Sequence, residues 1–414
     1  MKIITKIKCR MCHSTYEIYA YALRNNKELS SKELDILTKA LCKKEDPELI
    51  YYFARNISNL SKENIDSLID EMCKTNFLEV YIYLFAKEVP NLSKENIDNL
   101  VEEICEKGNP GYIYLFAKEV PNLSKENIDS LVEVICEKGI PEYISSFAKE
   151  VLNLSKENID SLVGAMCEEG NSKYISSFAK EVLNLSKENI DSLVEVICEK
   201  GIPEYISSFA KEVLNLSREN IDSLVGAMCD KRNSEDIYFF AKEMSNLSKE
   251  NIDNLVEATC KTESFDNIYL FARDILNLSK ENINSFVGAI CKMENSEDIY
   301  FFARNISNLS KENIDSMVEV MCRLKDAKYL YMFLKEIPCL TDENKKMLRE
   351  ELLNSNNIEY IDKYALYVDN SVIFERYGTI EKFYKHLSEI KMENNSQKNM
   401  KNDILEYKKY VYEQ

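Results

Sequence analysis

The sequence predicts an all-α protein: an α-solenoid superhelix of about eleven 31-residue helix-turn-helix repeats with a helical C-terminal cap. Two observations carry this prediction. The segment NLSKENIDSL, or a close variant, recurs down most of the 414 residues, and each copy has apolar residues at helical spacing. A third excludes the main alternative, because nine Gly, seven Pro and no Trp leave few residues for the tight turns of an all-β protein.

The period of the repeat is regular. Successive copies are 31 residues apart except for one step of 32 residues before Ser93. Aligned on their first hydroxyl residue, the copies begin at Ser30, Ser61, Ser93, Ser124, Ser155, Ser186, Ser217, Ser248, Ser279, Ser310 and Thr341.

Each copy opens with a helix. At Ser155 the hydroxyl can accept a hydrogen bond from a free N–H of the first turn, so this residue is expected to be the N-cap. Leu154 and Ile159 occupy the positions of a hydrophobic staple around it. Gly170 is the expected stop signal. The apolar stripe between them comprises Ile159, Leu162, Val163, Met166 and Cys167.

A shorter second helix is expected over about residues 142–151, with Pro141 in its first turn. Its apolar positions are Tyr143, Ile144, Phe147, Ala148 and Val151. Neither helix can bury its stripe alone, whereas stacking of successive pairs buries a continuous core.

Four regions are expected along the chain. Residues 1–15 form a basic N-terminal arm, 16–352 the α-helical repeat array, 353–392 the C-terminal helical cap and 393–414 a polar tail. No run approaches the 18 or so apolar residues of a membrane span, and the N-terminus lacks the apolar segment of a secretory signal. We therefore expect a cytoplasmic protein that does not enter a membrane.

The second helix carries the positions that vary most between copies. Two residues there are aromatic or aliphatic in the flanking repeats and Ser-Ser in three central ones, while the neighbouring Phe-Ala pair persists. Two interpretations are open: these side chains are exposed anchors for a partner, or they fill the gaps between repeats. The first makes the candidate partner-binding residues Tyr83, Leu84, Tyr114, Leu115, Tyr238, Phe239, Tyr269, Leu270, Tyr300 and Phe301.

The sequence gives little support for metal binding, disulfide formation or catalysis. Ten cysteines fall one per repeat on the apolar stripe, where we interpret them as small core residues in a reducing compartment. Cys9, Cys12 and His13 match the CxxCH pattern of haem attachment, which we interpret as a chance match. No phosphate loop, catalytic triad or zinc motif is present, so the expectation is a non-enzyme without cofactor, metal or catalytic residues.

The paired helices, such as DSLVEVICEKG followed by YISSFAKEV, resemble the α-solenoid superfamilies, among them tetratricopeptide, pentatricopeptide and HEAT-type arrays. The wider resemblance implies a protein-binding scaffold. The pentatricopeptide resemblance implies single-stranded RNA binding, with base reading near Asp160 and its equivalents, which are nearly all Asp.

The net charge of -18 limits the classes of partner that the protein is expected to bind. Affinity for nucleic acid needs Lys and Arg to displace counterions, so an acidic surface favours a basic protein or extended basic peptide. The leading hypothesis is thus a non-catalytic scaffold or adaptor with an acidic, aromatic-studded surface. The alternatives are an acidic nucleic-acid mimic that inhibits a nucleic-acid-binding enzyme, and pentatricopeptide-like RNA binding.

Overall fold

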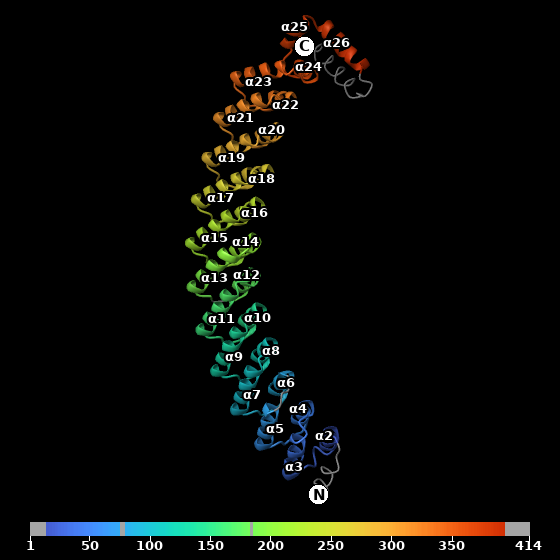
Figure 1. The fold of residues 1–414 in the computed structure, drawn as a ribbon, viewed down its shortest axis with the longest axis vertical. Helices are drawn as coiled ribbons and strands as arrows, with labels where there is room; N and C mark the ends of the chain where they lie inside the picture. Colours follow the sequence, from blue (N-terminus) through green and yellow to red (C-terminus); the bar gives the residue numbers. More distant parts are fainter. Residues whose placement is uncertain (1–13, 75–78, 183–184, 394–414) are drawn as a thin grey trace. The chain divides into compact units, whose positions relative to one another are not determined.

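The computed structural model describes residues 14–74, 79–182 and 185–393, and within these ranges all regular structure is α-helical (Figure 1). The chain divides into two compact units, Met1–Ala227 and Met228–Gln414. The boundary falls within α15 (Arg218–Lys231). The predicted all-α repeat solenoid is confirmed.

Unit 1 contains thirteen described helices before α15. They are α2 (Thr15–Arg24), α3 (Ser31–Cys42), α4 (Pro47–Asn56), α5 (Lys62–Lys74), α6 (Glu79–Glu88), α7 (Lys94–Lys107), α8 (Pro110–Glu119), α9 (Lys125–Lys138), α10 (Pro141–Glu150), α11 (Lys156–Glu169), α12 (Ser172–Glu181), α13 (Lys187–Lys200) and α14 (Pro203–Glu212).

Unit 2 continues the same alternation after α15. Its described helices are α16 (Ser234–Glu243), α17 (Lys249–Lys261), α18 (Phe265–Asp274), α19 (Lys280–Lys292), α20 (Ser296–Asn305), α21 (Lys311–Leu324), α22 (Ala327–Glu336), α23 (Asp342–Asn354), α24 (Ile358–Tyr367), α25 (Ser371–Tyr377) and α26 (Ile380–Glu393).

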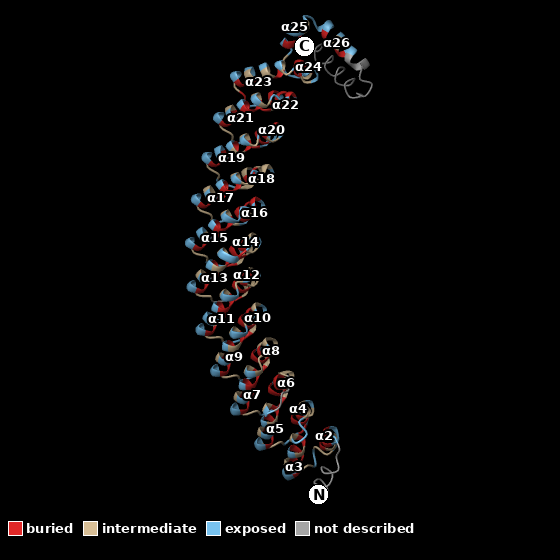
Figure 2. Ribbon diagram, viewed as in Figure 1, coloured by how far each residue is buried: buried red, intermediate tan, exposed pale blue. Residues whose placement is uncertain are grey.

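Within each unit the helices form two rows. Odd-numbered helices pack on the next odd-numbered helix, and even-numbered helices pack on the next even-numbered helix. Figure 2 shows buried residues on the sides of the helices that face their neighbours and exposed residues on the outer sides. Each repeat therefore contributes one helix to each row, as expected of a solenoid.

The odd-numbered helices form for the reasons that the sequence predicts. Ser155 is the N-cap of α11, and its side chain accepts a hydrogen bond from the backbone of Asn158. Leu162, Val163 and Met166 are buried on one stripe of this helix. Gly170 ends the helix in the left-handed conformation that favours glycine. At the equivalent position of α13, Gly201 also ends the helix, but with extended backbone.

The even-numbered helices carry the largest buried side chains. In α10, Pro141 occupies the first turn, and Ile144 and Phe147 are completely buried. Val151 is also buried but caps the helix instead of continuing it. One phenylalanine per repeat is fully buried in this row: Phe53, Phe85, Phe116, Phe147, Phe178 and Phe209 in unit 1, and Phe240, Phe271, Phe302 and Phe333 in unit 2.

The turns that lead from an even- to an odd-numbered helix depend on asparagine. Asn153, in the turn before Ser155, has a φ of 63°, a left-handed conformation that asparagine tolerates better than most residues. Equivalent asparagines with positive φ are Asn59, Asn91, Asn122, Asn215 and Asn277. The Asn of these six Asn-Leu-Ser segments thus has a backbone role that the sequence analysis did not assign.

The C-terminal cap begins as a half-repeat, because α24 packs on α22 and α23 and is followed by α25 and α26. At the other end of the described chain, α2 packs on α3 and α4 as the even-numbered helices of the repeats do. The predicted basic arm falls largely in residues 1–13 and the polar tail in 394–414, both outside the described residues. No described helix is long and apolar enough to cross a membrane.

Candidate partner-binding surface

In most odd-numbered helices an asparagine follows the capping serine by three residues, and Asn158 shows its three hydrogen bonds. The backbone N–H of Asn158 donates to Ser155 Oγ at 3.1 Å, and Asn158 Oδ1 accepts from the backbone N–H of Ser155 at 2.9 Å. Asn158 Nδ2 donates to Asp129 Oδ1 of the preceding repeat at 2.8 Å. One buried side chain therefore caps its own helix and ties it to the helix before it.

This third bond recurs through both units, and we call the series the asparagine ladder. Its other members are Asn64–Asp35, Asn96–Asp66, Asn127–Asp98, Asn189–Asp160 and Asn220–Asp191 in unit 1, and Asn282–Asp253, Asn313–Asn284 and Asn344–Asp315 in unit 2. The ladder includes Asp160 and its equivalents, where the pentatricopeptide resemblance placed base reading. Packing between repeats accounts for the uniformity of these aspartates.

A second series, the tyrosine ladder, joins the even-numbered helices. The Tyr114 hydroxyl of α8 donates to Glu150 Oε2 of α10 at 2.7 Å, and Lys118, one turn after Tyr114, pairs with the same carboxylate. The ammonium of Lys118 also donates to the Tyr114 hydroxyl at 3.1 Å. The other tyrosine–carboxylate pairs are Tyr51–Glu88 and Tyr83–Glu119 in unit 1, and Tyr238–Asp274 and Tyr300–Glu336 in unit 2.

In the tyrosine ladder, pKa shifts favour a proton on the tyrosine hydroxyl and a charged carboxylate. Burial, and secondly the hydrogen bond to Glu88, raise the pKa of Tyr51 to about 12. The hydrogen bonds from Lys118 and Tyr114 lower the pKa of the Glu150 carboxyl. Burial raises the pKa of Tyr114 as well, so at neutral pH the Tyr114–Glu150 rung is a neutral phenol that donates to a charged carboxylate, the stronger class of hydrogen bond.

The structure separates the two members of each predicted aromatic pair. The first member points between repeats: Tyr83, Tyr238 and Tyr300 are buried, and Tyr114 and Tyr269 are half-buried. The second member, one residue on, faces outward. Phe239 and Phe301 are 46% and 43% exposed, and Leu84, Leu115 and Leu270 are half-buried. Gap filling thus describes the first position, whereas the second retains accessible apolar surface.

The three central repeats keep the charges of the tyrosine ladder without its rings. Ser145 and Ser176 take the tyrosine positions of α10 and α12, and both are buried. The pairs Lys149–Glu181 and Lys180–Glu212 still join successive repeats, each at 3.0 Å. A change from tyrosine to serine at this position is therefore compatible with continued stacking.

The step from α18 to α20 in unit 2 departs from the tyrosine ladder. Where the steps of the tyrosine ladder place a carboxylate, α20 ends in Asn305. Arg273 of α18 instead pairs with the adjacent Asp274, at 2.5 Å and 2.9 Å, and its guanidinium lies 5.3 Å from the centre of the Tyr269 ring. This step therefore lacks the acidic rung that ties its neighbours together.

Three aromatic rings meet at the same step. Phe265 stacks on Tyr269 with 6.0 Å between ring centres, and Phe301 of α20 stands edge-on to both. Phe301 is 5.3 Å from Tyr269 and 6.2 Å from Phe265. We call these three residues the aromatic cluster. Sequence analysis named Tyr269 and Phe301 but missed Phe265, which stands where most other even-numbered helices begin with Pro, Ser or Ala.

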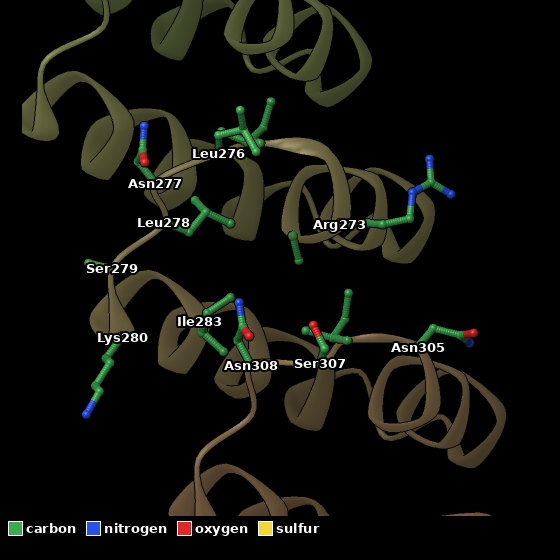
Figure 3. A pocket seen from close by; sticks show the side chains of 13 residues that line it. Arg273, Leu276, Asn277, Leu278, Ser279, Lys280, Ile283, Asn305, Ser307 and Asn308 are labelled. Carbon is green, nitrogen blue, oxygen red and sulfur yellow. The ribbon is translucent and has the colours of Figure 1, made fainter.

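A cavity of about 420 Å³ opens where α18 and α20 lead into their turns (Figure 3). Arg273 and Leu276 line one side, and Asn305 and Ser307 line the other. Leu276 is 80% exposed, an unusual environment for leucine. The equivalent turn residues Leu152 and Leu214 are also exposed, and the sequence analysis did not single out any of the three.

The repeated cysteines lie between successive odd-numbered helices. Cys42 Sγ is 3.5 Å from the Ser67 carbonyl oxygen, and Cys229 Sγ is 3.5 Å from that of Asn254. Burial raises the pKa of Cys105 and Cys136 to about 11, with nearby glutamates acting in the same direction. Unreactive protonated thiols fit the predicted packing role. The cysteines of the described residues form no disulfide.

The C-terminal cap holds a polar cluster that has no counterpart in the repeats. Asp362 of α24 is almost completely buried and accepts a hydrogen bond from the Tyr377 hydroxyl at 2.7 Å. His386 Nε2 of α26 lies 3.4 Å from the same carboxylate. Burial raises the pKa of Asp362. These groups link the three cap helices.

Metal chemistry has no geometric basis in the described part of the chain, where no three His, Cys, Asp or Glu side chains converge to hold an ion. The CxxCH residues Cys9, Cys12 and His13 lie outside the described residues.

No protein-family model matches the chain, and no curated protein matches it either. Among solved structures, a computationally designed self-assembling cyclic homo-oligomer is 14% identical over 80% of this chain and 97% of that chain, with a TM-score of 0.10. A de novo designed 16-helix transmembrane nanopore is 13% identical over 91% and 100%, with a TM-score of 0.12.

TM-scores this low carry no argument about this protein. Its class follows from its own helices: it is an all-helical protein of repeating helix pairs, consistent with a helical repeat solenoid. The comparisons name none of the tetratricopeptide, pentatricopeptide or HEAT families.

Proposed function

We propose that this protein is a non-catalytic scaffold that binds a basic protein or an extended basic peptide along its even-numbered helices. The observation that carries the proposal is the outward apolar position of the even-numbered helices, at which Phe239 of α16 and Phe301 of α20 are nearly half exposed. Large aromatic side chains in such positions are favoured anchors of protein interfaces. The tyrosine ladder beneath them supports a rigid row of helices, which lowers the entropy lost on binding.

Charge favours a basic partner. The net charge is -18, and a surface of one sign attracts partners of the other and disfavours nucleic acid. The protonated thiols of the repeats suit a reducing compartment such as the cytoplasm.

A capture experiment tests the proposal. The tagged chain is incubated with lysate of its own source, treated or untreated with nuclease, beside the double variant Phe239→Ala/Phe301→Ala. We expect a protein that is basic, survives nuclease and is lost with the double variant. Leu152→Ser and Leu214→Ser remove exposed apolar side chains outside the proposed surface and serve as matched controls.

The nucleic-acid mimic is the second candidate, and the acidic charge supports it as well. It predicts capture of a nucleic-acid-binding enzyme that is released steeply by salt and is indifferent to Phe239 and Phe301. Recovery of RNA, or a partner lost with nuclease, would overturn both proposals and favour RNA binding.

A further inference from the structure

The aromatic cluster at α18 and α20 combines accessible rings with carboxylates on the same two helices. Phe301 is 43% exposed and Phe265 is half-buried, so both rings retain accessible surface. Asp266 follows Phe265 on α18, and Asp298 lies one turn before Phe301 on α20. Residues three apart share a helix face, so Asp298 and Phe301 lie on one side of α20.

The charge of Asp266 acts on the Asp298 carboxyl. Burial, then Glu297 and Asp266, raise the pKa of the Asp298 carboxyl. In unit 1 the position of Asp298 is occupied by tyrosine, at Tyr112, Tyr143, Tyr174 and Tyr205. In α20 an acidic side chain, Asp298, thus replaces this tyrosine, whereas α18 has Asn267 there and carries its aspartate, Asp266, one position earlier.

A guanidinium already lies beside one ring of the aromatic cluster. The guanidinium of Arg273 lies 5.3 Å from the Tyr269 ring centre on the same helix, held there by Asp274. Asp274 neutralises this guanidinium, which leaves the negative charge of Asp266 and Asp298 for an incoming group. Guanidinium groups stack on aromatic faces and carry a diffuse, weakly hydrated charge, whereas a lysine ammonium is a compact and strongly hydrated one.

We propose that the aromatic cluster, together with Asp266 and Asp298, is a binding site for an arginine side chain of the partner. The guanidinium lies against Phe265 and Phe301, and the two aspartates supply its counter-charge. This inference rests on the proposed function, since it names the group of the basic partner that the scaffold recognises.

The test measures fluorescence anisotropy of the full chain with a short fluorescein-labelled peptide of alternating glycine and arginine, and with its lysine counterpart. The arginine peptide is expected to bind more tightly than the lysine peptide. The double variant Phe265→Ser/Phe301→Leu uses residues that the chain itself has at these positions in other repeats. It is expected to weaken arginine binding by about fivefold or more, as loss of cation–π contacts predicts.

Two further variants complete the test. Asp266→Asn/Asp298→Asn is expected to weaken binding more at about 50 mM than at about 300 mM salt, because screening already removes charge attraction at the higher concentration. Leu152→Ser is the matched control and should bind as the parent does. Circular dichroism of every variant reports that its helices are intact.

Equal affinity for the two peptides, or unchanged arginine binding in Phe265→Ser/Phe301→Leu, would overturn the arginine site. A captured partner that depends on Phe239 and Phe301 but tolerates Asp266→Asn/Asp298→Asn would also overturn it and leave the scaffold proposal intact. Failure of the scaffold proposal has a different signature, namely capture that Phe239→Ala/Phe301→Ala does not change.

Discussion

Removal of one acceptor of the asparagine ladder should destabilise the repeat that follows it. In Asp129→Ala, Asn158 Nδ2 loses the oxygen that it contacts at 2.8 Å, while Asn158 remains 6% exposed. A buried donor without a partner costs about 1–3 kcal/mol. Asp129 is only half-buried, so water can reach part of the space, and we expect a loss of about 1–2 kcal/mol in the free energy of unfolding.

The chain offers its own matched control for this change. At the equivalent position Asn284 accepts from Asn313 at 2.7 Å, so an amide oxygen can replace the carboxylate. Asp129→Asn should therefore keep the bond and cost about 0.5 kcal/mol or less.

Urea unfolding followed by circular dichroism gives the total loss for both variants. Repeat arrays can unfold in parts. Hydrogen exchange of the amides in α9 and α11 is therefore needed to show which repeats lose stability. Equal stability of Asp129→Ala and Asp129→Asn would refute the reasoning, since the ladder bond would then contribute nothing.

Four other predictions follow from the same contacts. Tyr114→Phe removes the hydroxyl that donates to Glu150, and we expect the free energy of unfolding in urea to fall by about 1 kcal/mol; no change would mean that the rung is not formed. A Cβ at Gly288 would meet no atom within 4 Å, so Gly288→Ala should raise helix stability by about 1 kcal/mol, seen as a higher urea midpoint; a lower midpoint would reveal crowding. Iodoacetamide at pH 8 should modify the exposed Cys339 before the thiols of the repeats, because burial raises the pKa of the repeat thiols. Peptide mass spectrometry measures the order, and equal rates of labelling at all these cysteines would contradict it. Folding raises the pKa of these thiols from 9.0 to about 11, so the folded state binds more protons between these values and stability should fall as pH rises through this interval; a urea midpoint that stays constant over this range would count against buried thiols.

The periodicity of the sequence was sufficient to predict the helices. Ser155 as a cap, the stripe through Leu162 and Met166, and the buried Phe147 all follow from spacing within one repeat, and the structure confirms them. The partners of Asn158 and Tyr114 could not be predicted in this way. Their hydrogen bonds cross to residues 29 and 36 positions away, and that register exists only once the repeats stack.

The sequence predicted the candidate surface only in part, because the exposure of each side chain also depends on how the repeats stack. Adjacent positions on a helix point about 100° apart, so Tyr300 is buried against the next repeat while Phe301 faces outward. Alternation between tyrosine and serine fits either environment. The cap cluster around Asp362 gave no signal at all, because its members come from three helices that do not repeat.

The asparagine ladder makes the length of the chain adjustable in whole repeats. Each rung uses an asparagine amide as donor and a side-chain oxygen as acceptor, an aspartate except at Asn284, so excision or duplication of a 31-residue block would rejoin equivalent partners. The step that contains one additional residue already demonstrates tolerance, since Asn96 still donates to Asp66 at 2.7 Å across a separation of 30 residues. The number of repeats can therefore change by unequal recombination without any new kind of side chain. The number of outward positions on the even-numbered helices changes with it.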